Sequence, residues 1–257
     1  MTRVVVSLFD ESGNMGRPWA DAGYAVHCFD ILNIDRETEY FPSGGLIMYH
    51  YADLDDYAQW PFIKSLRPSL MFSFSPCDDV AVSGSLHFAK KLAANPQCQI
   101  IACNRARLVE KLANEAGCAW MHENPVSVLS TMWRKPDFYF DPSDYGGYLP
   151  ENDIHPRWPD YIAPRDAYPK KTGIRCGNGF VIPPMRKVER APGYSAQHKK
   201  LGGKSAKTKQ IRSETPRGFA RAVFEANARK PDCERMALRV LDKEGRDVTY
   251  SAKDSVR

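Results

Sequence analysis

The sequence predicts an α/β fold built on a mostly parallel, doubly wound sheet. Five compact apolar runs, rich in β-branched or aromatic residues, have the composition of buried strands, and helix-forming stretches separate them. These runs cover residues 4–9, 25–29, 46–51, 70–74 and 119–122. Strands that alternate with helices run parallel, so their carboxyl ends meet at one edge of the sheet, where ligands bind.

The first three strands lead to acidic residues. The first is followed by the glycine-containing turn Asp10-Glu11-Ser12-Gly13-Asn14-Met15-Gly16, and Pro18 then begins a short helix. The second strand ends in Asp30, and the third leads to Asp53. We therefore expect carboxylates at the ligand-binding edge of the sheet.

The fourth and fifth strands lead to a thiol and a further carboxylate. The fourth is followed by Ser75-Pro76-Cys77, and the fifth by Glu123-Asn124-Pro125. A helix is predicted between them over 96–116, with Gly117 as its end. Prolines fix both loops, so the sequence places a candidate nucleophile and a candidate acid at neighbouring strand ends.

The second half of the chain is expected to hold less regular structure. Residues 133–170, rich in Pro, Tyr, Trp and Asp, predict an ordered loop, and 173–182 could return as a hairpin. Residues 190–212 are rich in Gly, Lys and Ser and are predicted to be mobile. Pro216 begins a predicted helix that continues through Phe224.

The predicted organisation is one α/β domain with small additions. A chain of 257 residues with 43% apolar content can bury one substantial core. We expect the domain at 1–182, a basic segment at 183–212, a returning helix at 213–230 and a tail or short hairpin at 231–257.

The sequence predicts a cytoplasmic protein without a metal. No apolar run is long enough to cross a bilayer, and the chain enters Arg3-Val4-Val5-Val6 without the pattern of a signal sequence. Seven cysteines, an odd number without a C-x-x-C pair, support neither a disulfide framework nor a zinc knuckle. His122 and His155 are too isolated to indicate a metal site.

Positive charge is concentrated in one segment. The net charge is only +5, but residues 186–230 hold thirteen Lys or Arg against three acids. This asymmetry indicates a polyanionic partner, most simply the phosphates of nucleic acid. The candidate contacts are Lys199, Lys200, Lys204, Lys207, Lys209 and Arg212. A solvated basic loop without a partner is the alternative interpretation.

The edge of the sheet also predicts a cofactor that contains adenosine. The turn that follows Phe9 lets backbone amides approach a ligand, and Asp30 can accept two hydrogen bonds from a ribose. Acids at strand ends are otherwise helix caps or solvated turns, and this alternative stays open for Asp30 and Asp53. The G-x-G-x-x-G pattern of dinucleotide sites and the P-loop are both absent.

Cys77 and Glu123 each have an alternative interpretation as structural, non-catalytic residues. Cys77 could be an ordinary buried cysteine, and as a nucleophile it would need a lowered thiol pKa. Glu123 could be a helix cap or one side of an ion pair, whereas a catalytic carboxyl group would polarise a pyrimidine ring. Serine hydrolysis is excluded because the sequence has no G-x-S-x-G motif.

These motifs together resemble those of the cytosine-C5 DNA methyltransferases. Ser7-Leu8-Phe9-Asp10-Glu11-Ser12-Gly13 resembles the first motif of the family, Ser75-Pro76-Cys77 its Pro-Pro-Cys loop, and Glu123-Asn124-Pro125 its Glu-Asn-Val motif. Thr215-Pro216 and the helix that follows are similar to the last motif. The stretch 124–148 looks most like compact phage and prophage members.

The resemblance implies a Rossmann-like class I methyltransferase fold with S-adenosyl-L-methionine as cofactor. It implies that Cys77 adds to C6 of a cytosine flipped out of DNA, while Glu123 holds the base and C5 receives the methyl group. Arg175 is the candidate for the arginine that steadies the base. The implied cofactor contacts are Phe9, Asp10, Ser12, Gly13, Asp30, Asp53, Pro76, Thr215 and Pro216.

The sequence departs from the family at three places. Asp10-Glu11-Ser12 makes the first loop more acidic than usual, and Ser75 replaces the second proline of the nucleophile loop. Asp78 replaces the usual glutamine, and its negative charge should raise the thiol pKa. Residues 183–212 leave no room for a large target-recognition domain.

Two alternatives to DNA methylation remain open. One is modification of RNA or of a free pyrimidine nucleotide, and the other is a catalytically silent relative that binds nucleic acid.

Overall fold

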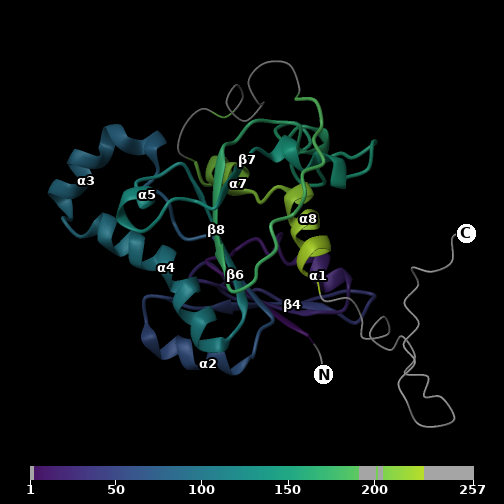
Figure 1. Cartoon of the computed structure of the whole chain (residues 1–257), viewed down its shortest axis with the longest axis horizontal. Helices are drawn as coiled ribbons and strands as arrows, with labels where there is room; N and C mark the ends of the chain where they lie inside the picture. Colours follow the sequence, from purple (N-terminus) through teal and green to yellow (C-terminus); the bar gives the residue numbers. More distant parts are fainter. Residues whose placement is uncertain (1–2, 191–200, 202–204, 229–257) are drawn as a thin grey trace, which may run out of the picture.

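The computed structural model describes residues 3–190, 201 and 205–228, and an eight-stranded sheet forms its centre (Figure 1). The strand order is β3-β4-β2-β1-β5-β6-β8-β7. Five parallel strands make up most of the sheet: β1 (Val4–Leu8), β2 (Ala25–Asp30), β4 (Leu46–Tyr51), β5 (Leu70–Ser73) and β6 (Ala119–Pro125). The predicted mostly parallel, doubly wound, Rossmann-like sheet is therefore confirmed.

Three further strands complete the two ends of the sheet. β3 (Glu39–Tyr40) pairs antiparallel with β4 at one edge. At the other end, β8 (Thr172–Gly177) runs antiparallel between β6 and β7 (Phe138–Phe140). β3 and β8 therefore run against the five parallel strands, whereas β7, being antiparallel to β8, runs in the same direction as them.

The order of the strands creates a switch point between β1 and β5. From β1 the chain builds outward through β2 and β4, and it then crosses to the other side of β1 to form β5 and β6. The loops that follow β1 and β5 therefore leave the sheet in opposite directions. Ligands of open α/β sheets bind in the crevice that this divergence creates.

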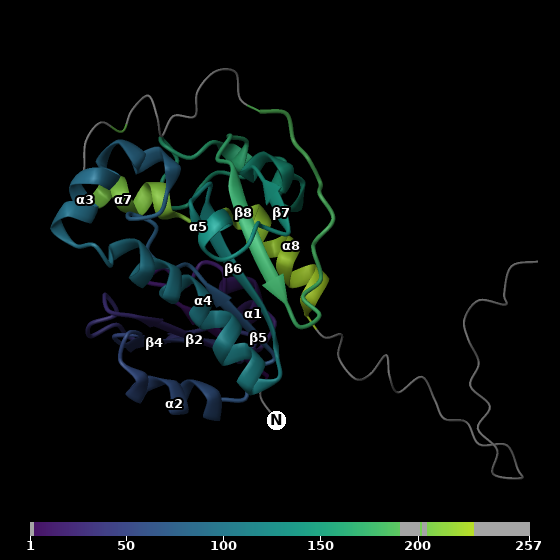
Figure 2. The ribbon, with the colours of Figure 1, turned by 60° about the vertical axis from the view of Figure 1, so that its left-hand side comes forward.

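Helices cover both faces of the sheet (Figures 1 and 2). α2 (Trp60–Ser65) and α4 (Cys98–Ala116) lie on one face, and α1 (Arg17–Asp21) and α8 (Arg217–Asn227) lie on the other. Successive residues of β1 serve the two cores in turn: Val5 packs with the α1 and α8 side, and Val6 with the α2 and α4 side.

The predicted boundary of α4 is confirmed at its carboxyl end. Gly117 has a φ of 68°, the left-handed conformation that ends a helix, and its N–H donates to the carbonyl groups of Ala113 and Asn114. No helix in the described ranges has both the length and the apolar content needed to cross a membrane.

Shorter helices connect these elements. The α-helical ones are α3 (Phe88–Ala94), α5 (Leu129–Met132) and α7 (Ala206–Ser213). The 3-10 helices are η1 (Tyr57–Gln59), η2 (Val82–His87), η3 (Pro142–Asp144), η4 (Gly146–Tyr148) and η5 (Pro164–Asp166).

The second half of the chain is more regular than predicted. The expected loop at 133–170 contains β7, and in place of the expected hairpin at 173–182 residues 172–177 form one strand of the main sheet, β8. Residues 206–213, most of them in the segment 190–212 predicted to be mobile, form α7. The Ser205 side chain accepts from Thr208 N (3.2 Å), and Ile211 is buried. The predicted tail at 231–257 lies outside the described residues.

Candidate functional site

Asp10 holds the loop that follows β1. It is buried and accepts hydrogen bonds from Ser7 Oγ (2.7 Å), Ser12 Oγ (2.9 Å) and Gly13 N (2.7 Å). Phe9, just before it, takes a positive φ of 54°, so the strand ends in a sharp turn. The acid that makes this motif unusual therefore stabilises the turn itself.

Gly13 allows the loop to pack closely on β4. Its φ is +70°, and a Cβ atom at this position would lie 2.6 Å from Tyr49 Oη. The same tyrosine donates to Glu39 Oε1 (2.6 Å), and the Arg36 guanidinium lies 3.5 Å from the centre of its ring. Protein side chains thus fill the space behind the loop and fix its position.

Asp30 and Asp53 lie at the carboxyl ends of β2 and β4, as predicted. Burial, and to a smaller extent the nearby charges of Asp10 and Glu11, raise the pKa of the Asp30 carboxyl group. The hydrogen bond that Asp30 accepts from Leu32 N (2.8 Å) lowers this pKa, but burial and the two charges outweigh it, so the pKa is raised overall. Asp53 is exposed and accepts from Asp55 N (3.0 Å). Both carboxylates therefore keep capacity to accept further hydrogen bonds.

The residues at this edge fit part of S-adenosyl-L-methionine. Asp30 suits a ribose hydroxyl, and the next two side chains, Ile31 and Leu32, are 51% and 60% exposed and provide an apolar surface for a purine. The direct contact predicted for Asp10 stays a prediction, and its oxygens already accept three hydrogen bonds, from Ser7, Ser12 and Gly13.

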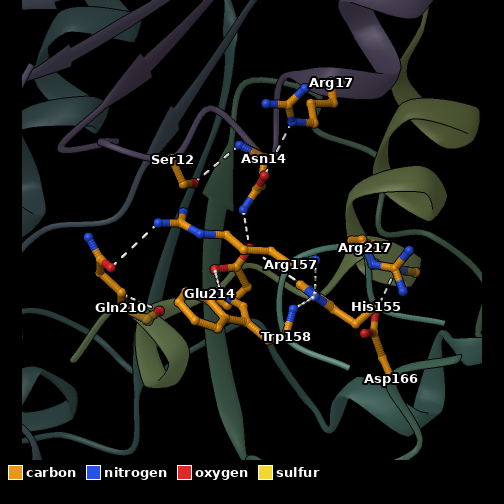
Figure 3. A network of polar contacts seen from close by, with 12 residues as sticks. Ser12, Asn14, Arg17, His155, Arg157, Trp158, Asp166, Gln210, Glu214 and Arg217 are labelled. Carbon is orange, nitrogen blue, oxygen red and sulfur yellow. Dashed lines mark hydrogen bonds and ion pairs between the residues drawn. The ribbon is translucent and has the colours of Figure 1, made fainter. Parts of the chain in front are cut away.

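The segment before α8 docks on the loop that follows β1, although 200 residues separate them (Figure 3). Asn14 Nδ2 donates to Glu214 Oε1 (2.5 Å), and Trp158 Nε1 donates to Glu214 Oε2 (3.2 Å). Burial is the main cause that raises the pKa of Glu214. The neighbouring Thr215 and Pro216 are buried at the start of α8.

A polar network around Glu214 was not predicted from the sequence. His155 Nδ1 accepts from Trp158 N (2.9 Å) (Figure 3). Gln210 Nε2 on α7 donates to Glu11 Oε1 (3.4 Å). The sequence feature that could have indicated this network is the concentration of His, Arg and Trp at 155–158. The network joins this loop, α7 and the first turn around one buried carboxylate.

The amino end of α8 is fixed by two aspartates. Asp166 Oδ2 accepts from Gly218 N (2.9 Å), and burial raises the pKa of Asp166 to about 6. Arg217 donates two hydrogen bonds to Asp153, at 2.9 and 2.6 Å. The chain between β7 and β8 therefore positions the amino end of α8.

Cys77 and Glu123 lie close enough to interact electrostatically. Burial, then Glu123, then Asp78 raise the pKa of the Cys77 thiol to about 11, whereas Lys170 lowers it. Burial also raises the pKa of Glu123, which Lys170 opposes. The structure therefore brings the thiol, the carboxyl group and one cation together, and the expected effect of Asp78 on the thiol is confirmed.

Ser75, at the position of the missing proline, connects the two strand ends. Its buried hydroxyl group lies 2.9 Å from His122 Nε2. Burial lowers the pKa of His122 to about 3, so this imidazole is neutral. Pro76, between Ser75 and Cys77, is exposed. The Ser75–His122 contact thus connects the loop after β5 to β6, close in sequence to both Cys77 and Glu123.

Arg175, whose role in steadying the base stays a prediction, has its side chain on the opposite face of the sheet from Glu123. It pairs with His122 across β6 and β8, while Ile174 pairs with Glu123, so Arg175 and Glu123 point to opposite faces of the sheet. Arg175 is 1% exposed, and its Nε donates to the Arg134 carbonyl group (2.8 Å). Its terminal nitrogens have no hydrogen-bond partner among the described residues.

The predicted nucleic-acid contacts are described only in part. Lys207, Lys209 and Arg212 lie on α7 and are exposed. The Lys207 ammonium group lies 5.2 Å from the centre of the Tyr161 ring. Lys199, Lys200 and Lys204 lie outside the described residues. In the part of the chain that the structure covers, no group of His, Cys, Asp and Glu side chains is arranged to hold a metal ion.

Comparisons with known proteins give a distant likeness in fold. No protein-family model and no curated protein match the chain, whereas 32 chains of solved structures do. One of these is described as a DNA modification methyltransferase encoded within an E. coli prophage, with 12% identity and a TM-score of 0.35. The match covers 68% of this chain and 46% of that protein, so the chain spans less than half of its length. A likeness at this level does not assign a function.

Proposed function

We propose that the protein is a DNA methyltransferase that depends on S-adenosyl-L-methionine and modifies cytosine at C5. The observation that carries this proposal is the convergence of Cys77, Glu123 and Lys170 at the carboxyl edge of β5 and β6. The proposed cofactor residues lie on the other side of the switch point, at the ends of β1, β2 and β4. A base and a methyl donor could therefore meet above the junction of β1 and β5.

In the proposed reaction, the Cys77 thiolate adds to C6 of a cytosine that has left the DNA stack. Glu123 is suited to hold N3, because a carboxyl group with a raised pKa can carry the proton that N3 accepts. Addition at C6 makes C5 nucleophilic, and the cofactor supplies the methyl group. Loss of the C5 proton then expels Cys77 and restores the aromatic ring.

Lys170 is suited to favour the thiolate of Cys77. Its positive charge lowers the pKa values of both Cys77 and Glu123. A pKa of about 11 leaves the isolated thiol protonated at neutral pH, so substrate binding must also contribute to its activation. Desolvation, Glu123 and Asp78 are the influences that such binding would have to overcome.

The proposed cofactor contacts are the backbone of the Ser12–Gly13 turn, Asp30 and Asp53. Thr215 and Pro216 would cover this edge, since the Asn14–Glu214 hydrogen bond brings their segment to the turn. We propose DNA phosphates as the partners of Lys207, Lys209 and Arg212, which α7 presents to solvent.

Transfer of a radiolabelled methyl group tests the proposal. S-adenosyl-L-methionine labelled in the methyl group is incubated with DNA, RNA or dCMP and with the protein or its Cys77→Ala variant. We expect label in DNA, located at C5 of cytosine, with the intact protein only. Transfer to RNA or dCMP alone would contradict the proposed substrate.

A second candidate is a catalytically silent protein that binds nucleic acid. The raised thiol pKa favours it, because a protonated thiol is a poor nucleophile. DNA binding that weakens with salt, without transfer of label to any substrate, would favour this candidate over the first.

A further inference from the structure

A groove separate from the Cys77–Glu123 site runs between the η1–α2 segment and α4. Its volume is about 770 Å³, within the range of sites for small molecules. The two walls come from residues 54–60 and from the face of α4 between Ile101 and Asn114. Figure 2 shows α2 and α4 side by side on this face of the sheet. Neither Cys77 nor Glu123 lines the groove.

An aromatic pair forms one wall of the groove. The rings of Tyr57 and Trp60 are 4.5 Å apart between centroids and meet edge to face at 67°. Trp60 Nε1 donates to the Leu54 carbonyl group (3.2 Å), which fixes the indole ring. Tyr57 is 70% exposed, so its ring is accessible to a ligand. In this wall the Trp60 ring is held in place, and the Tyr57 ring beside it is exposed to solvent.

The opposite wall carries positive charge. Arg107 is exposed and forms no ion pair among the described residues, and the Lys111 ammonium group lies 4.5 Å from the centre of the Trp60 ring. Arg105 and Asp55 neutralise each other through a bidentate ion pair. Glu110 is the remaining acid of the lining and accepts from Trp133 Nε1 (3.2 Å). Apart from the Arg105–Asp55 pair, the lining thus holds two cations, Arg107 and Lys111, and one carboxylate, Glu110, which already accepts a hydrogen bond.

We propose that this groove binds a nucleotide. A nucleobase would stack on Tyr57, and its phosphate would lie against Arg107 and Lys111, four residues apart on α4. The Asn104 side chain, also in the lining, offers donors and an acceptor to the base edge. The nucleotide could be free or part of a single strand. This site does not depend on the proposed methyl transfer.

Calorimetric titration with AMP, TMP and a thymidine hexanucleotide tests the site. We expect binding to the intact protein and to Cys77→Ala, and a loss of affinity of about tenfold in Tyr57→Ala. Tyr57→Phe should retain binding, because it keeps the ring. Arg107→Ala should weaken binding of each phosphate-containing probe. Tighter binding of the hexanucleotide than of TMP would identify a strand as the natural ligand, and equal affinity a free nucleotide.

Matched variants separate the groove from general effects. Tyr40→Ala removes a tyrosine that is 80% exposed on β3, and Arg221→Ala removes an exposed arginine of α8, so both should bind like the intact protein. Asp30→Ala should leave binding of TMP and of the hexanucleotide unchanged, because neither probe contains the adenosine proposed to bind at Asp30. Absence of binding to all three probes, or equal losses in the control variants, would overturn the proposal. So would a loss in Asp30→Ala without one in Tyr57→Ala, which would place the nucleotide at the predicted cofactor edge.

Discussion

At the scale of single residues, the chemistry of the candidate site is governed by the surroundings of Cys77. Burial and two carboxylates oppose formation of its thiolate, and Lys170 favours it. Asp78 is the exposed member of this group and can be replaced without disturbing the core. Replacement of Asp78 is therefore a means to adjust the reactivity of the thiol.

We predict that Asp78→Asn increases the reactivity of Cys77. Removal of the negative charge should lower the thiol pKa, and a fall of about half a unit would raise the thiolate fraction at pH 8 about threefold. The rate of alkylation by iodoacetamide, followed by mass spectrometry of the peptide that contains Cys77, measures this change. Asp79→Asn is the matched control, because Asp79 pairs with Lys91 instead. An unchanged or slower rate in Asp78→Asn would contradict the prediction.

Asp166 makes folding stability depend on pH. Its folded pKa of about 6 lies above its ordinary value of 3.8, so the folded state binds the proton more tightly than the unfolded state. The carboxyl group therefore costs stability above its folded pKa, and the cost disappears as the pH falls towards 3.8. An asparagine would keep an acceptor for Gly218 N without this cost.

We predict that Asp166→Asn stabilises the protein at pH 7.5 by on the order of 2 to 3 kcal/mol. The gain in free energy of unfolding over the intact protein should grow between pH 4 and pH 6.5 and then level off. Urea denaturation of both proteins across this range measures it. A gain that does not change with pH would show that ionisation of Asp166 is not its cause.

At the scale of elements, α8 depends on close contact with the loops that precede β8. A Cβ atom on Gly218 would lie 2.4 Å from the Tyr145 carbonyl oxygen, which belongs to backbone that cannot easily move. The helix also buries Phe219 and Val223 in the core shared with α1. Its position, and that of Thr215 and Pro216 before it, therefore depends on a small residue at 218.

We predict that Gly218→Ala destabilises the protein by about 1 to 3 kcal/mol, because the added methyl group forces α8 away from the loops. It should also weaken binding of S-adenosyl-L-methionine if 214–216 covers the cofactor edge. Thermal unfolding and calorimetry measure the two effects. Gly84→Ala is the control, since the nearest atom to its Cβ would be 3.8 Å away. Equal stability of the two variants would contradict the close contact at Gly218.

The sequence predicts a strand or helix well where the segment itself has an apolar run or an end signal. The parallel strands and α4 have continuous apolar runs or clear end signals, such as Gly117. β8 lacks such a pattern because two of its positions are glycines that neighbouring side chains require. A Cβ atom on Gly173 would lie 2.8 Å from Pro136 Cγ, and one on Gly177 would lie 2.6 Å from Trp120 Nε1. Pairing with β6 and β7, which the sequence does not display, therefore defines this strand.

At the scale of the whole molecule, the topology explains which site residues could be predicted. Asp30 and Glu123 lie near the carboxyl ends of parallel strands, and Cys77 and Asp53 follow two others, so their common edge could be deduced from strand order alone. The position of Arg175 depends on the register of an antiparallel strand, where a shift of one residue reverses the face. The network around Glu214 depends on contacts between segments that are distant in sequence, and no local pattern reports these.

Covalent trapping with DNA that contains 5-fluorocytosine tests the central claim most directly. With fluorine at C5 there is no proton for a base to remove after methyl transfer. The elimination that breaks the bond between Cys77 and C6 is therefore blocked, and that bond should persist. We predict a protein–DNA adduct that requires S-adenosyl-L-methionine, maps to Cys77 by mass spectrometry and is absent in Cys77→Ala. Failure to form this adduct, with both the cofactor and DNA bound, would contradict the proposed role of Cys77.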